Sequence, residues 1–461
     1  MKPYRSRKYI YYFLVISLIM GPTLLLPNAY GASKTTSPPA TLTSGPQVRD
    51  DGLTVLVHEI PTKDDRGIDF LTLIVKTGYA HDPAQLLGLN ELTTEIINYY
   101  LRYSEAFVSA INYSDFTVYR FTVTHQDYLK FCRDLDAVIS AEALLEYDLC
   151  NQLIRNHQNQ PRLPGKIAVA NLTRLVYGPN HPYALCFEPD FANLDINAVN
   201  QWFRKIYRPA NLLIASTHQL PDDFLRKPSG RDLKEAITQN TIPPPWGASS
   251  QGASSEGAGS TGGSVKDTGA LVNFTPLRDN LSHICLGFPG PRVSASGFFS
   301  MILITRYLDE ELKRQIREES GFCYDISVSY AYLERATAPL FEITLQTLPG
   351  DTEAAVAKIM NILKKLGREG IPEEQLTRIM SREKILIESK TGEASLATNQ
   401  AIDALFGQNW FASPGLYLSQ LAEASTSVKN TMNQYLPKLR ISITGPPESE
   451  PVVSKLVTLL H

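Results

Sequence analysis

Glu91 and Glu95 are the first residues of this chain whose type and spacing suggest metal chemistry. They lie four residues apart in a segment with helical periodicity after Gly88, so a helix would present both carboxylates on one face. Such a pair can hold a hard cation such as Ca²⁺ or Mg²⁺. Like charges at this spacing also occur on exposed helices, at a cost of only about 0.2–0.5 kcal/mol. In that simpler interpretation both Glu side chains lie in solvent, and the inward residues are Leu89, Leu92, Ile96, Ile97 and Tyr100.

Histidine spacing excludes the common zinc-hydrolase motifs. Two imidazoles four residues apart on a helix can share one zinc ion, with a neighbouring glutamate acting as base on the bound water. No two of the eight histidines are separated by four residues, so neither H-x-x-E-H nor H-E-x-x-H occurs. No G-x-S-x-G motif is present, and no P-loop or G-x-G-x-x-G follows a strand. The chain therefore holds no complete hydrolase motif of these kinds.

The elements that would position these residues follow a repeated order. After the turn dipeptide Asp51-Gly52, a strand is predicted at 53–57, and a second strand at 70–75 follows a polar turn, which suggests a hairpin. Each half then has a strand leading into an amphipathic helix, and each closes with a helix followed by a strand. These segments are 116–123, 126–139, 198–206 and 212–215 in the first half, and 340–346, 352–366, 428–434 and 439–443 in the second. The pattern predicts two copies of one α+β unit.

A Gly, Ala and Ser-rich stretch at 247–264, preceded by three prolines, separates the two halves. This composition cannot bury enough apolar area to offset its ordering entropy, so a flexible linker is predicted. The predicted divisions are a signal peptide at 1–31, a disordered leader at 32–47, an N-terminal domain at 48–240, a linker at 241–268 and a C-terminal domain at 269–461.

The N-terminus is typical of an exported protein. Four basic residues precede an apolar run from Ile10 to Leu26, and small residues at Ala29 and Gly31 suit a signal peptidase. A secreted protein, periplasmic or extracellular, with no membrane span after signal cleavage is expected; an uncleaved N-terminal anchor is the alternative. The five cysteines form no C-x-x-C pair and are interpreted as buried apolar thiols.

The composition limits the kinds of molecule that the chain is expected to bind. The chain has 461 residues, 43% of them hydrophobic, which is enough for two or more buried cores. The formal net charge of −3 provides no basic surplus for phosphate neutralisation, so nucleic-acid binding is not expected. A peptide, protein or small molecule is the favoured partner.

Several motifs, taken in order, make the chain resemble the pitrilysin/insulinase family of metallopeptidases. Their residues are Asp51-Gly52-Leu53, Val75-Lys76-Thr77-Gly78, Gly88-Leu89, Ala106-Phe107-Val108-Ser109-Ala110, Tyr207-x-Pro209-x-Asn211, Leu312, Arg317-Glu318-x-x-Gly321-x-x-Tyr324 and Thr444-Gly445-Pro446. The resemblance covers most of the chain outside the leader and linker. It implies two homologous halves, each a mainly antiparallel sheet flanked by helices, facing one another like the shells of a clam.

The resemblance also implies where a zinc site would lie. Counting from Gly88, the two histidines of the family's H-x-x-E-H fall on Glu91 and Glu95, and the general base falls on Thr94. The family's third ligand is a more distant Glu, but no acidic residue lies between Asp148 and Glu188. These degenerate positions imply a non-catalytic chain with no cofactor of its own and no metal.

The second half keeps an Arg/Tyr pair that the family uses opposite the zinc. In the resemblance, Arg317 and Tyr324 contact the substrate backbone and the developing oxyanion, which suits a fixed cation and a phenol donor. The alternative is a surface helix on which Arg317 pairs with a neighbouring Glu, while Tyr324 packs in a strand.

The expected function follows from the missing zinc motif and the retained Arg/Tyr pair. The chain is expected to form a heterodimer with a catalytic, zinc-bearing homologue, to supply half of a peptide chamber, and to place Arg317 and Tyr324 in the partner's site. The alternative is a peptide-binding or assembly scaffold with no proteolytic role, because a fold does not fix a function. An active enzyme with rebuilt chemistry is the third interpretation.

Overall fold

The computed structural model describes residues 45–57, 67–102, 104–144, 147–160, 163–186, 189, 191–226, 271–331, 338–389 and 393–460. The predicted signal peptide and the predicted linker lie outside these ranges, as does the predicted leader up to residue 44. Within the ranges described, no helix combines the length and the apolar character needed to cross a membrane.

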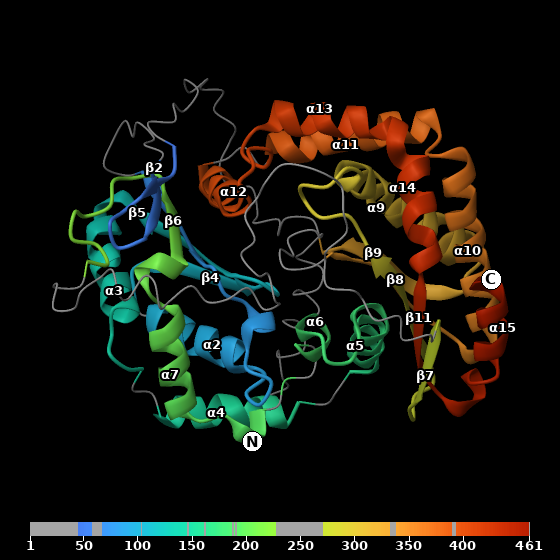
Figure 1. Ribbon diagram of the computed structural model, residues 1–461, viewed down its shortest axis with the longest axis horizontal. Coiled ribbons are helices and arrows are strands. Elements are labelled where there is room, and N and C mark those ends of the chain that lie inside the picture. Colours follow the sequence, from blue (N-terminus) through green and yellow to red (C-terminus); the bar gives the residue numbers. More distant parts are fainter. Residues whose placement is uncertain are drawn as a thin grey trace, which may run out of the picture.

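The first half forms a mixed six-stranded sheet with the order β1-β2-β6-β3-β5-β4 (Figure 1). Only β2 and β6 are parallel neighbours; the other pairs are antiparallel. The strands are β1 (Gln47–Val48), β2 (Thr54–Val57), β3 (Ile68–Val75), β4 (Ala106–Asn112), β5 (Thr117–Thr124) and β6 (Leu212–Ser216).

Helices cover both faces of this sheet, which explains why most residues of β3 and all residues of β6 are buried on both sides. On one face, residues of α2, α3 and α7 form a core with Leu71, Leu73 and Val75 of β3. The helices of this half are α2 (Leu89–Leu101), α3 (Tyr128–Ile139), α4 (Tyr147–Gln158), α5 (Pro164–Tyr177), α6 (Pro182–Leu185) and α7 (Ile196–Ile206).

The second half repeats the arrangement with a five-stranded sheet in the order β7-β11-β8-β10-β9. Its strands are β7 (Val272–Pro276), β8 (Ser282–Pro289), β9 (Cys323–Tyr330), β10 (Leu340–Thr347) and β11 (Arg440–Gly445). Its helices are α9 (Phe298–Leu312), α10 (Thr352–Glu369), α11 (Glu373–Ser389), α12 (Glu393–Phe406), α13 (Pro414–Ala424), α14 (Val428–Tyr435) and α15 (Val452–Leu460), with a π-helical segment, η5 (Lys313–Glu319), after α9.

The two halves correspond element by element. The order β2-β6-β3-β5-β4 matches β7-β11-β8-β10-β9, and in each sheet the only parallel neighbours are the first two of that order. Both α2 and α9 begin after a glycine in the left-handed region, Gly88 at φ 96° and Gly297 at φ 90°, a conformation that side chains with a Cβ rarely adopt. The prediction of a duplicated α+β fold with two helix-flanked sheets is confirmed.

The halves exchange one helix each (Figure 1). Helix α5 of the first half packs on β8 and β11 of the second sheet, where Leu172 lies in a core with Cys285 and Leu340. Helix α12 of the second half packs on β3 and β6 of the first sheet, and the hydroxyls of Thr72 and Thr398 lie 2.9 Å apart. Each sheet therefore buries one face with a helix from the other half.

The predicted hairpin between the first two strands is wrong. Strand β6, which follows them by more than a hundred residues, lies between β2 and β3 and pairs with both. Local sequence could not reveal this insertion, because strand neighbours are set by tertiary pairing and not by proximity along the chain.

The cysteines match their interpretation as apolar thiols. All five are free; four are buried and Cys186 is half-buried. Burial raises the pKa of the Cys132 thiol to about 12, which removes its nucleophilic form at neutral pH.

Candidate functional site

Helix α2 is anchored at its N-terminus by a buried aspartate. The backbone N–H groups of Gly88 and Asn90 donate to the two carboxylate oxygens of Asp82, at 2.8 and 2.9 Å. Burial raises the pKa of Asp82 to about 8, and these backbone hydrogen bonds oppose the shift. Since the first N–H groups of a helix have no partner within it, Asp82 fixes where α2 starts and which way its face points.

Thr94, at the position of the family's general base, is used for structure. It is 5% exposed, and its hydroxyl lies 2.8 Å from the carbonyl oxygen of Asn90 and 3.0 Å from Oδ1 of Asn112. The same Oδ1 accepts a hydrogen bond from the hydroxyl of Thr117 at 2.8 Å. This network joins α2 to β4 and β5, and it places no titratable group at the base position.

The structure brings His157 to the Glu pair, which sequence reasoning missed. Nε2 of His157, on α4, lies 3.1 Å from Oε2 of Glu95, and one ligand atom each from Glu91, Glu95 and His157 all lie within 4.8 Å of one another. The ring of His157 stacks on Phe191 at 4.2 Å. The stretch between Asp148 and Glu188 contains no acidic residue but does contain His157, and this histidine is the feature of the sequence that could have indicated the cluster.

Glu91 and Glu95 are half-buried, so the interpretation that placed both in solvent is wrong, although Leu89, Leu92, Ile96 and Ile97 do point inward. Burial is the largest influence on Glu91 and raises the pKa of its carboxyl. Burial lowers the pKa of His157, but the hydrogen bond and charge of Glu95 outweigh it, so the net shift is upward. Both shifts favour the protonated forms of Glu91 and His157.

The residues at this cluster do not fit the zinc chemistry that the resemblance implies. Two carboxylates and one imidazole are acceptable donors for a divalent cation. Hydrolysis also requires a base beside the metal-bound water, and Thr94 cannot serve. The imidazole is also engaged with Glu95 in an ion pair. The cluster of Glu91, Glu95 and His157 therefore has the donor atoms for a cation, but Thr94 gives it no carboxylate base.

Arg317 and Tyr324 come together on the surface of the second half. The guanidinium carbon of Arg317 lies 5.6 Å from the centre of the Tyr324 ring, and Tyr324 is 87% exposed. Arg317 lies within η5, the π-helical segment that follows the end of α9 at Leu312. Such π-helical segments inside helices are frequent at functional sites.

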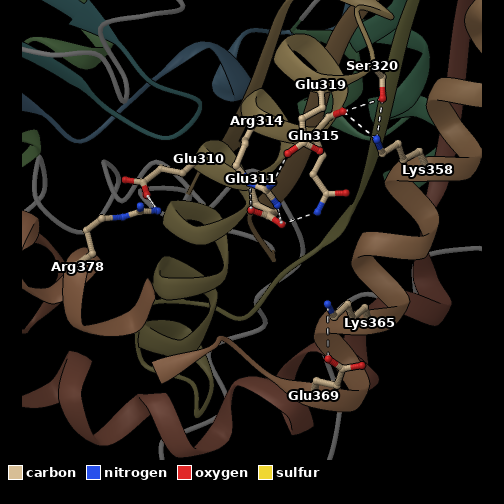
Figure 2. Close-up of polar contacts among 10 residues, drawn as sticks. All are labelled: Glu310, Glu311, Arg314, Gln315, Glu319, Ser320, Lys358, Lys365, Glu369 and Arg378. Carbon is tan, nitrogen blue, oxygen red and sulfur yellow. Dashed lines mark hydrogen bonds and ion pairs between the residues drawn. The ribbon is translucent and has the colours of Figure 1, made fainter. Parts of the chain in front are cut away.

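Figure 2 shows the polar network that holds η5 in place. Arg314 donates to both oxygens of Glu311 and pairs with Glu319. From α10, Nζ of Lys358 donates to the carbonyl oxygen of Gln315 at 3.0 Å and to the hydroxyl of Ser320 at 2.6 Å.

The surface-helix alternative for Arg317 assigned it a neighbouring Glu as its partner. Arg314, not Arg317, makes the ion pairs with Glu311 and Glu319, while the guanidinium of Arg317 lies over Tyr324. Arg317 on η5 and Tyr324 on β9 are thus presented together to solvent.

Comparisons with known proteins agree with this fold. Residues 255–383 match the family model described as peptidase M16 inactive domain. No curated protein matches the chain. Among solved structures, the peptidase M16 inactive domain from Pseudomonas fluorescens is similar, with 18% identity, a TM-score of 0.66 and coverage of 88% of this chain and 98% of that chain.

Two further structures are similar. A protease from Helicobacter pylori has 13% identity and a TM-score of 0.66, with coverage of 87% of this chain and 99% of its own. A chain of Complex III2 from Candida albicans, with Inz-5 bound, has 12% identity and a TM-score of 0.63, with coverage of 90% and 99%. At these identities the solved structures show only that the fold is shared. The match to the family model is a similarity in sequence, over residues 255–383. Residues 255–383 are therefore similar in sequence to the inactive domain of the peptidase M16 family, and the fold of the chain is similar to that of M16 structures.

Proposed function

We propose that this chain is an exported, non-catalytic pitrilysin-type subunit. It forms a peptide-binding chamber with a zinc-bearing homologue and assists that partner's metal-dependent peptide hydrolysis. The two halves would face one another across this chamber like the shells of a clam. The zinc ion of the complex belongs to the partner, and this chain contributes no catalytic metal.

Thr94 is the observation that carries the proposal. The position that needs a carboxylate base holds a buried hydroxyl committed to Asn90 and Asn112. The positions that need imidazoles hold Glu91 and Glu95. Helix α2 thus retains its packing role in the first core without the groups that activate water.

Arg317 and Tyr324 supply the chemistry that a non-catalytic partner can offer. A guanidinium that is always charged can bind a peptide carbonyl or stabilise a developing oxyanion, and a phenol can donate a hydrogen bond to the same oxygen. Their exposure allows them to reach a site on another chain, and η5 is held by Lys358 so that the cation is presented from a fixed backbone.

The edge strands of both sheets favour a peptide as the bound molecule. Strands β4 and β9 end the two sheets, and both point toward the middle of the molecule in Figure 1. An edge strand offers unpaired backbone groups to which an extended peptide can add. Phe107 on β4 is 75% exposed and offers an apolar contact for a peptide side chain.

The decisive experiment compares the chain alone with a reconstituted pair. The tagged chain is used to isolate an H-x-x-E-H homologue from the organism that encodes it, and hydrolysis of fluorogenic peptides is measured. We expect no hydrolysis by the single chain, hydrolysis by the pair, and loss of at least about tenfold when the chain carries Arg317→Ala with Tyr324→Phe.

Matched controls separate this role from a general surface effect. Arg378→Ala and Tyr147→Phe remove an exposed cation and an exposed phenol elsewhere, with 64% and 60% exposure, and should leave the pair's activity unchanged. Full activity with the Arg317 and Tyr324 variant, or failure to isolate any such homologue, would contradict the proposal and favour the scaffold. Chelator-sensitive hydrolysis by the single chain would revive the active enzyme.

A further inference from the structure

A second cluster of metal-ligand residues lies away from α2, at the other end of the first sheet. Asp69 is the second residue of β3, His125 directly follows β5, and His218 follows β6 by two residues. Strand β3 lies between β5 and β6 and runs antiparallel to both, so its start meets the ends of its two neighbours. The topology therefore gathers three residues from distant parts of the sequence.

This cluster is separate from the Glu91, Glu95 and His157 cluster. Asp69 stands six residues before Val75, where β3 ends on the way to α2. At a rise of about 3.3 Å per residue, the two ends of that stretch lie about 20 Å apart. The two clusters have no residue in common.

The donor atoms already converge. One ligand atom each from Asp69, His125 and His218 all lie within 4.8 Å of one another. Nδ1 of His125 lies 2.8 Å from Oδ2 of Asp69, and the rings of His125 and His218 meet edge to face with centres 4.7 Å apart. Donors around a tetrahedral zinc ion lie about 3.4 Å apart, so small side-chain rotations would complete the set.

Burial distinguishes this cluster from an ordinary surface group. Asp69 is 2% exposed, and a buried carboxylate requires a cationic or hydrogen-bonding partner. His125 and His218 are half-buried, so the imidazole side is open to solvent and an ion can enter from there. One imidazole is enough to pair with Asp69, but the structure brings two.

Neighbouring side chains contact Asp69 and His218 and restrict their positions. The hydroxyl of Tyr128 donates to the carbonyl oxygen of His218 at 3.1 Å and lies 2.7 Å from the hydroxyl of Ser216. The ring of Tyr128 also packs edge to face on that of His218, with centres 5.0 Å apart. Thr217 places its hydroxyl 3.4 Å from Oδ1 of Asp69. Contacts of this kind orient the ligands of metal sites.

We propose that Asp69, His125 and His218 bind a divalent first-row transition-metal ion, with zinc as the principal candidate. Two imidazoles and one carboxylate suit Zn²⁺ and related ions and disfavour Ca²⁺ and Mg²⁺, which take oxygen ligands. The ion would tie together the ends of β3, β5 and β6. This proposal concerns a site separate from the degenerate zinc-motif positions Glu91, Thr94 and Glu95, so it stands whether or not the chain assists a peptidase.

The test uses the purified full chain after tag removal and chelator dialysis, titrated with Co²⁺ and then Zn²⁺. To remove the other cluster, the titration is repeated with Glu91→Gln plus Glu95→Gln. We expect one equivalent of Co²⁺ with visible d–d absorption in both proteins, and displacement by Zn²⁺. His125→Gln or His218→Gln should weaken binding at least about tenfold.

A thermal melt supplies a second readout. Zn²⁺ should raise the Tm of the wild-type chain, because an ion that binds only the folded state stabilises it, and should not raise the Tm of His218→Gln. A metal-free melt of His218→Gln close to that of wild type shows that the variant is folded. The proposal is overturned if wild type takes up no Co²⁺, if His125→Gln and His218→Gln bind as tightly as wild type, or if binding disappears in the double Glu variant.

Discussion

The imidazole Nε2 of His157 lies 3.1 Å from the carboxylate Oε2 of Glu95, across the interface of α4 and α2. Glu95 stands at one of the two positions that the sequence resemblance assigns to zinc-binding histidines. The contact gives α2 an ion pair whose strength depends on the protonation of His157, since the pKa of that imidazole is raised by Glu95.

The stability of the chain should depend on pH through this pair. The folded-state pKa of His157 is raised above its ordinary 6.5, so the stabilisation is fully present below 6.5 and is lost as pH rises through the folded value. Because Glu95 is 36% exposed, the effect should reach only about 0.5–1 kcal/mol. Denaturant unfolding of wild type and His157→Gln at pH 6 and pH 8.5 should show a larger difference at pH 6. Glu95→Gln should behave like His157→Gln; equal differences at both pH values would contradict the assignment.

Removing the anchor of α2 should destabilise the first half. Asp82→Ala leaves the N–H groups of Gly88 and Asn90 without their acceptor in a buried position, and we expect a loss of about 1–2 kcal/mol. Denaturant unfolding measures the loss, with the exposed Asp222→Ala as control. A loss no larger than that of the control would show that α2 does not depend on this cap.

Arg317 and Tyr324 should contribute little to folding. Both are exposed, so Arg317→Ala and Tyr324→Phe should each change the free energy of unfolding by less than about 0.5 kcal/mol. Thermal melts of the single chain check this, alongside peptide hydrolysis by the reconstituted pair. Unchanged melts with reduced hydrolysis indicate substrate contact, whereas a large loss of stability would assign the pair to structure.

The exchanged helices should keep the halves together when the linker is cut. With a protease site inserted within 247–264 and cleaved, we expect the two fragments to elute as one species, because α5 and α12 each pack on the opposite sheet. Leu172→Ala, in the buried face of α5, should lower the free energy of unfolding by about 2–5 kcal/mol. The exposed Leu129→Ala is the control. Separation of the fragments after cleavage would show that the packing of α5 and α12 does not hold the two halves together.

Local sequence patterns predicted individual helices and strands well. The helix predicted at 352–366 is α10, and the strand predicted at 116–123 is β5, displaced by one residue at each end. Apolar periodicity identifies which residues face a core, because every helix or strand on a sheet must bury one side. The same patterns also located β2 and β3, but their predicted pairing as a hairpin was wrong, because β6, from the end of the domain, lies between them.

The sequence by itself determined the absence of the zinc motif, since no fold can supply imidazoles and a carboxylate base at positions that hold Glu91, Thr94 and Glu95. It also indicated the duplicated plan, because each copy repeats the same local periodicities. Only the tertiary structure placed His157 beside Glu95 and gathered Asp69, His125 and His218 at one sheet end. These residues come from elements far apart in the chain, and side chains meet across such distances only when sheet order and helix packing bring their backbones together.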